Sequence, residues 1–126
     1  PENVFKFMRS QLIGLEVEKF WSLSLNRKNR VLQLHEATSG TASNSLAHPR
    51  EILREAIRSR ASSLICVQNH TSGDPSPRAA EILVTRQLKE ASRIIGVPLL
   101  DHVIVGSKAG DPSGLGWYSF QGSGLI

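Results

Sequence analysis

Residues 62–70 read Ser62-Ser63-Leu64-Ile65-Cys66-Val67-Gln68-Asn69-His70. The centre of this stretch is a short, continuous apolar run, which is typical of a buried strand, and we predict a strand over residues 62–68. The next segment, residues 71–77, is rich in glycine, proline and serine and is therefore predicted to be a loop. The strand thus delivers Gln68, Asn69 and His70 to the mouth of a loop.

Beyond this loop, apolar residues recur at helical spacing. Ser76 and Pro77 suit the cap and first residue of a helix, and Gly96 suits its end. The apolar arc of this helix contains Leu83, Val84, Leu88, Ala91, Ile94 and Ile95. Residues 103–105 and 117–120 predict two further strands, joined by a turn-rich segment.

The residues before the central strand predict a helix followed by a hairpin. Asn3 suits the cap of an N-terminal helix that occupies most of residues 1–16. Large apolar residues alternate with small polar ones over residues 20–25, and a polar turn separates them from a second apolar segment, residues 31–34. This alternation predicts two antiparallel strands.

A second helix is expected after the hairpin. Ser39-Gly40-Thr41 is predicted to be a loop, His48 a helix cap, and Pro49 a residue of the first helical turn. The apolar face of this helix contains Ile52, Leu53, Ala56 and Ile57. The sum is a single α/β domain over residues 1–126, with a mixed sheet of about five strands flanked by about three helices.

Composition excludes several classes of protein. The sequence has 126 residues, 40% of them hydrophobic, and no apolar run long enough to cross a membrane. Its first residues lack the features of a signal peptide, so a cytoplasmic location is expected. The single cysteine, Cys66, excludes an internal disulfide and a multi-cysteine zinc site. A net charge of +4 permits binding to acidic partners without requiring it.

The end of the central strand is a natural place for a metal site. Residues two apart on a strand share a face, so Gln68 and His70 point the same way. Residues 78 and 81 share a face at the start of the next helix and look back at the strand end. Glu18, at the start of the first strand, is a candidate general base because a carboxylate can deprotonate a metal-bound water.

These segments together resemble the RadC family. The segments that carry the resemblance are residues 39–41, 48–52, 67–77, 99–106 and 118–120, and the match runs from about Glu18 to Ile126. RadC proteins contain a JAMM (MPN) domain, similar to the zinc isopeptidases that remove ubiquitin, with a layer architecture like that of cytidine deaminases. Many carry a helix-hairpin-helix DNA-binding segment in front. That segment is absent from this sequence, so the chain is expected to correspond to the C-terminal domain.

The resemblance implies a specific set of site residues. The family motif is an upstream glutamate that activates water, then His-x-His, seven residues, serine, two residues and aspartate, with the histidines and aspartate on zinc. In this sequence the general base falls on Glu18, the zinc ligands on Gln68, His70 and Glu81, and the serine on Arg78. Only Glu18 and His70 keep the residue type of the motif.

The substitutions predict weak zinc binding. The neutral amide of Gln68 is a poorer zinc ligand than an imidazole, whereas Glu81 keeps a carboxylate that is one methylene longer. Arg78 brings a permanent cation, which repels a divalent ion by roughly several kcal/mol at an effective dielectric near 20. The same changes predict that Arg78 pairs with Glu18, Glu81 or both as a fixed replacement cation.

Three functions follow from this sequence. The first is a catalytically impaired binding or scaffold domain with a protein or peptide partner, connected to DNA repair by the family name. The second is a zinc metallopeptidase of the JAMM type, with Glu18 as base. The third is DNA binding through the basic helix face of Arg50, Arg54 and Arg58. His102 is expected to have a structural role at the start of a strand.

Overall fold

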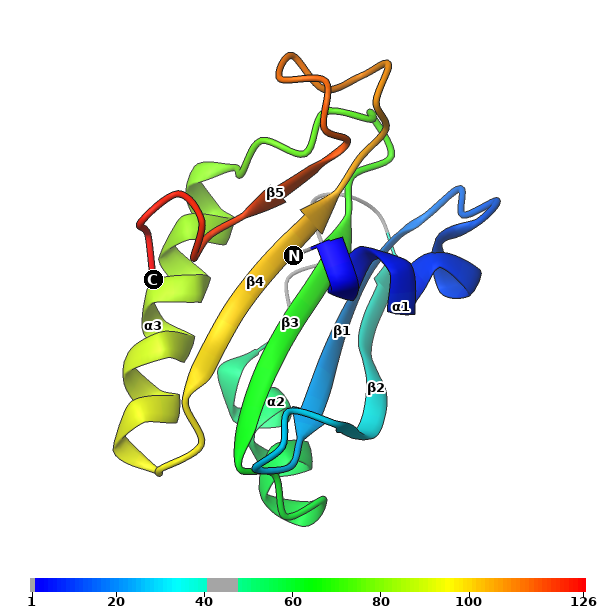
Figure 1. Ribbon diagram of the computed structural model, residues 1–126. Coiled ribbons are helices and arrows are strands. Elements are labelled where there is room, and N and C mark those ends of the chain that lie inside the picture. The colour runs from blue at the N-terminus through cyan, green and yellow to red at the C-terminus, as the bar shows by residue number, and fades with distance from the viewer. Residues whose placement is uncertain (1, 41–47) are drawn as a thin grey trace.

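The computed structural model describes residues 2–40 and 48–126. These residues form a layered α/β structure, shown in Figure 1. In chain order its elements are α1 (Glu2–Leu12), β1 (Glu18–Leu25), β2 (Val31–Gly40), α2 (Pro49–Arg58), β3 (Ser63–Asn69), α3 (Ala79–Ile94), β4 (Leu99–Val105) and β5 (Trp117–Ser119). The predicted mixed sheet of five strands with three helices is therefore confirmed.

The sheet has the strand order β2-β1-β3-β4-β5. Strands β3 and β4 are parallel and connected through α3, whereas the other neighbouring pairs are antiparallel. Because β1 runs antiparallel to β3, the start of β1 lies beside the end of β3. The start of α3 lies at the same end of the sheet. Three elements therefore converge where the central strand β3 ends.

Each face of the sheet has its own apolar core. Alternation along the strands sends Phe20 and Cys66 to the face covered by α2 and α3, and Trp21 and Val67 to the face covered by α1 (Figure 1). Met8 is the fully buried residue by which α1 packs on its face. The central strand β3 is buried on both sides, which explains its continuous apolar run.

Several predicted boundaries are wrong. The strand predicted at residues 103–105 begins earlier, at Leu99, because Leu99, Asp101 and His102 also pair with β3. Helix α1 begins at Glu2, so Asn3 lies inside its first turn instead of capping it. Helix α3 begins at Ala79 with Arg78 as its N-cap, later than Pro77, because the Glu81 carboxylate accepts a hydrogen bond from the Arg78 backbone N–H at 2.8 Å.

The loop predicted at residues 39–41 is also wrong at its first two residues. Ser39 and Gly40 pair with β1 and extend β2, because β1 is long enough to offer them partners. Thr41 lies outside the described residues. The predicted cap of α2 is confirmed, since His48 Nδ1 accepts a hydrogen bond from the Arg50 N–H at 3.1 Å. Within residues 2–40 and 48–126, no helix has the length and apolar character needed to span a membrane.

The two sides of α3 make a matched test of the core. Leu88 is fully buried between α3 and the sheet, whereas Leu83 is exposed. The predicted apolar arc is therefore wrong at Leu83, Ile94 and Ile95, all exposed, because the face of α3 that packs on the sheet carries Glu81, Thr85, Leu88 and Ser92. We expect Leu88→Ala to lower the free energy of unfolding by about 2–5 kcal/mol, because it leaves a cavity, and Leu83→Ala to lower it by less than about 1 kcal/mol. Urea denaturation followed by circular dichroism measures both. Equal losses would contradict this packing.

Candidate functional site

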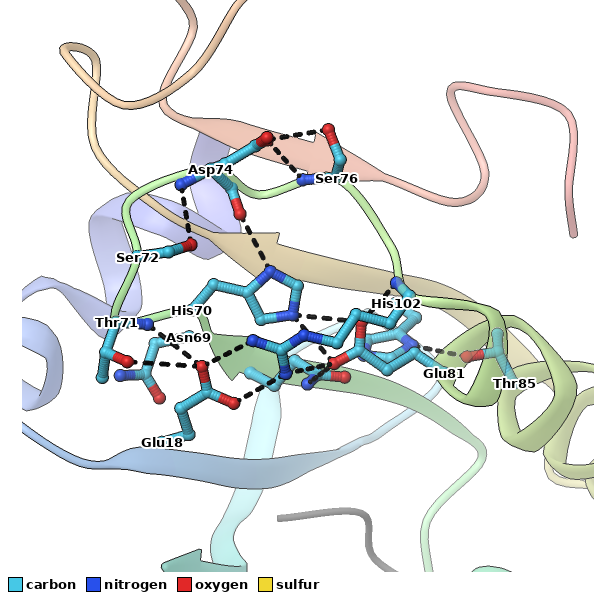
Figure 2. A network of polar contacts seen from close by, with 12 residues as sticks. Glu18, Asn69, His70, Thr71, Ser72, Asp74, Ser76, Glu81, Thr85 and His102 are labelled. Atoms are coloured by element: carbon cyan, nitrogen blue, oxygen red, sulfur yellow. Dashed lines mark hydrogen bonds and ion pairs between the residues drawn. The ribbon is translucent and has the colours of Figure 1, made fainter. Parts of the chain in front are cut away.

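The five residues predicted for the site converge at the carboxyl end of β3. Glu18 starts β1, Gln68 and His70 stand at the end of β3, and Arg78 and Glu81 cap and begin α3. Pairing of Phe20 with Gln68 in the sheet brings the start of β1 alongside these residues. Glu18, His70 and Glu81 point toward one another in Figure 2, although they come from three different elements.

Arg78 joins the two carboxylates of the site. Its guanidinium donates to both oxygens of Glu18, with Nη1 to Oε1 at 2.8 Å and Nη2 to Oε2 at 2.9 Å. The same Nη1 lies 3.4 Å from Oε2 of Glu81. The Glu18 and Glu81 side chains are each 2% exposed, so their charges are removed from water. The replacement cation that the sequence predicts is therefore present, paired bidentately with Glu18.

Glu81 also accepts hydrogen bonds from β3. The Nε2 atom of His70 lies 2.8 and 3.0 Å from its two oxygens, and Nε2 of Gln68 donates to Oε2 at 2.7 Å. The other nitrogen of His70, Nδ1, lies 2.9 Å from the carbonyl oxygen of Asp74. A carbonyl oxygen only accepts, so Nδ1 carries a proton and His70 is held at both ends.

The pKa shifts describe a charge-balanced group. The hydrogen bonds from Arg78 lower the pKa of Glu18 below its usual 4.5. Burial is the largest single effect and opposes ionisation of both His70 and Glu81. Their mutual hydrogen bond, the backbone hydrogen bonds of Asp74 and Arg78 and the attraction between the charges together outweigh it, so the pKa of His70 is raised above 6.5 and that of Glu81 is lowered below 4.5. With His70 protonated, two anions and two cations face one another. We call Glu18, Gln68, His70, Arg78 and Glu81 the ion-pair network.

As arranged, this network does not fit a zinc ion. The His70 nitrogen that would bind metal points at Glu81, and Gln68 turns its NH₂ donor toward the same carboxylate. The Arg78 guanidinium occupies the space between the carboxylates. Within residues 2–40 and 48–126, no three His, Cys, Asp or Glu side chains are grouped as a metal site would need.

The structure adds supporting contacts that the sequence pattern did not indicate. The Thr71 N–H donates to Oε2 of Glu18 at 3.1 Å. Asn69 accepts from the Lys19 N–H at 2.7 Å and donates to the Val17 carbonyl at 3.0 Å, which ties the end of β3 to the start of β1. The asparagine at the end of the strand was the sequence signal that could have indicated these contacts. Its hydrogen-bond partners lie about fifty residues away along the chain, so the sequence pattern did not identify them.

His102 has the expected structural role, though within β4 and not at its start. Its ring stacks on Phe120 with centroids 4.7 Å apart, and its Nδ1 lies 2.7 Å from the Thr85 hydroxyl (Figure 2). Burial lowers the pKa of His102 to about 3, so the ring is neutral. Burial also raises the pKa of the Cys66 thiol, which makes it a poor nucleophile.

The fold and the position of the site define a class of protein. A sheet flanked by helices, with a glutamate from β1 facing residues at the β3 end and the α3 start, is the arrangement of a JAB-type domain. The chain belongs to the RadC family within this class, because the family model for the RadC-like JAB domain matches residues 1–125.

Bacterial relatives support the same assignment. A UPF0758 protein of Halalkalibacterium halodurans is 44% identical over 108 residues, which cover 86% of this chain and 47% of the relative. A UPF0758 protein of Shouchella clausii is 43% identical over 106 residues, covering 84% of this chain and 46% of the relative. The chain therefore spans just under half the length of these relatives.

Removing the guanidinium tests whether it neutralises the site. Arg78→Met leaves two buried carboxylates without their shared cation, and we expect it to lower the free energy of unfolding at pH 7 by about 2–3 kcal/mol, less than for a fully buried pair because Arg78 is partly exposed. The loss should shrink as pH falls below 4.5 and the carboxylates protonate. Urea denaturation measures it. Arg54→Met, which breaks an exposed pair with Glu51, is the control; similar losses at pH 7 would refute the role of Arg78.

The His70–Glu81 pair predicts a second pH dependence with the opposite sign. A raised histidine pKa contributes stability that is fully present below 6.5 and lost as pH rises through the folded-state value. The difference in unfolding free energy between the wild type and His70→Gln should therefore be larger at pH 6 than at pH 9. His35→Gln, in β2 outside the network, serves as control. A difference that does not vary with pH would show that His70 is neutral in the folded protein.

Proposed function

We propose that this chain is a RadC-type JAB domain in which the ion-pair network takes the place of a metal centre, and that it works as a binding or scaffold domain without hydrolase activity. The observation that carries the proposal is the bidentate pairing of Arg78 with Glu18. A general base must accept a proton from water. Glu18 has both oxygens engaged by a permanent cation and a lowered pKa, so it is a weak base.

The ligand positions support the proposal in the same way. A zinc hydrolase of this kind needs three protein ligands and an open position for water. Here the imidazole and the carboxylate bind each other, and the glutamine adds a donor where a ligand is needed. Admitting zinc would require breaking these hydrogen bonds and displacing Arg78, and the cation would still repel the metal nearby.

A binding function has a place beside the network. A cavity of about 420 Å³ lies between α1 and the loops that follow β3 and β4. The apolar side chains of Phe5, Leu12 and Leu15 line one side of it, and residues 69–73 line the other. A mostly apolar wall opposite polar residues suits an extended peptide, which we propose as the class of partner. The connection to DNA repair rests on the family name and stays a prediction.

Metal analysis tests the proposal directly. After washing with chelator, reloading with zinc and desalting, we expect the wild type to retain far less than one equivalent. The triple variant Gln68→His, Arg78→Ser, Glu81→Asp restores the motif and should retain about one equivalent, since it replaces the Gln68 amide by an imidazole ligand and removes the Arg78 cation. Elemental analysis by mass spectrometry gives the ratio.

The single variant Glu81→Asp is the matched control, because it changes a ligand but leaves Arg78 in place, and it should not gain zinc. One tightly held equivalent in the wild type, with cleavage of a peptide substrate abolished by Glu18→Gln, would instead establish the zinc metallopeptidase.

A further inference from the structure

A cluster of exposed cations lies at the end of the sheet opposite the ion-pair network. The turn between β1 and β2 carries Arg27, Lys28 and Arg30, all exposed. Arg60 is exposed just after α2, in the segment that enters β3, and the Ser62 N–H of this segment donates to the Leu25 carbonyl at 2.7 Å. Figure 1 shows the turn and the end of α2 at the same end of the sheet. We call Arg27, Lys28, Arg30 and Arg60 the basic end.

The cations of the basic end differ from those along α2. On the α2 face, Arg50 and Arg54 pair with Glu51, and Arg58 pairs with Glu55. By contrast, no carboxylate of the described residues lies within ion-pair distance of the four side chains of the basic end. The basic end therefore carries four cations without an ion-pair partner among the described residues, whereas the predicted stripe of Arg50, Arg54 and Arg58 is largely neutralised.

The turn that carries these cations is held in one conformation. The Asn26 side-chain oxygen accepts from the backbone N–H groups of Lys28 and Arg30 at 2.9 and 3.0 Å. The Asn26 N–H donates to the Arg30 carbonyl at 2.9 Å, and Asn29 adopts the left-handed conformation with φ of 59°. A ligand thus meets a turn whose backbone is already ordered, and one hollow is lined by Asn26, Arg27, Lys28, Arg30 and Ser62.

We propose that the basic end binds the phosphodiester backbone of duplex nucleic acid. Arginine forks match phosphate oxygens bidentately, and three of the four cations are arginines. Residues 26–30 and 58–62 contain no aromatic side chain on which bases of a single strand could stack, so a duplex is favoured. They also offer no large apolar side chain at the tip of the turn for insertion into a lipid surface.

This surface is independent of the ion-pair network. Strand β1 has eight residues, which at about 3.3 Å per residue separates its two ends by roughly 23 Å. Binding at the basic end therefore leaves the cavity beside His70 open for another partner, and changes at one end should leave the other intact.

Two triple variants that remove the same charge give the test. The turn variant is Arg27→Gln, Lys28→Gln, Arg30→Gln, and the stripe variant is Arg50→Gln, Arg54→Gln, Arg58→Gln. Fluorescence anisotropy with a labelled DNA duplex of about 20 base pairs, at salt from about 50 to 200 mM, measures affinity and its salt dependence. Thermal melts confirm that both variants fold.

We expect the wild type to show a slope of log affinity against log salt of about −3 to −4, from four phosphate contacts. The turn variant should lose at least about tenfold in affinity at the lowest salt and bring the slope close to about −1, whereas the stripe variant should lose about threefold or less. Equal losses in the two variants, or no binding by the wild type, would overturn the proposal. So would turn-dependent binding that is tighter to phosphatidylserine vesicles or to polyglutamate than to the duplex.

Discussion

Two buried carboxylates need two cations, and the structure at the end of β3 is organised around that requirement. Glu18 and Glu81 come from different elements and would repel each other strongly in a site removed from water. Arg78 satisfies Glu18 through two hydrogen bonds and touches Glu81, while His70 holds Glu81 from the other side. These contacts tie β1, β3 and α3 together where the chain has its most polar interior. The start of α3 is part of the same arrangement, because Glu81 also accepts from the Arg78 backbone.

A tethered guanidinium and a bound divalent metal ion can both compensate carboxylate charge, but they differ in charge and in chemistry. A metal ion has an open position at which water becomes acidic, whereas a guanidinium offers only donors with fixed directions and does not lower the pKa of water in this way. In this chain the cation beside the two carboxylates is the side chain of Arg78. Membership of the RadC family and a hydrolytic centre are separable properties, since the first depends on the fold and the second on a few side chains.

The two ends of β1 lie in regions of opposite character. Its start lies among buried, mutually paired charges around His70, and its end leads into an ordered turn with exposed cations. The buried ion pairs connect elements of the fold. The exposed cations of the basic end form no ion pair within the described residues, so they do not connect elements in this way. Charge of the first kind is part of the structure, and charge of the second kind is available to a partner.

Local sequence signals were sufficient to predict the order of the helices and strands and the positions of most site residues. A continuous apolar run marked β3, helical spacing marked α3, and the separation of Gln68, His70, Arg78 and Glu81 placed them at one strand end, because these signals are local. Only the tertiary structure decided that Glu18, some sixty residues from Arg78, is its bidentate partner, that α3 begins at Ala79, and that β2 continues to Gly40. The tertiary structure also showed which exposed cations are paired. The arginines of α2 form ion pairs with Glu51 and Glu55, whereas the cations of the β1–β2 turn form none within the described residues. The physical reason is that burial and ion pairing depend on which elements the fold brings together, and distance along the chain does not reveal it.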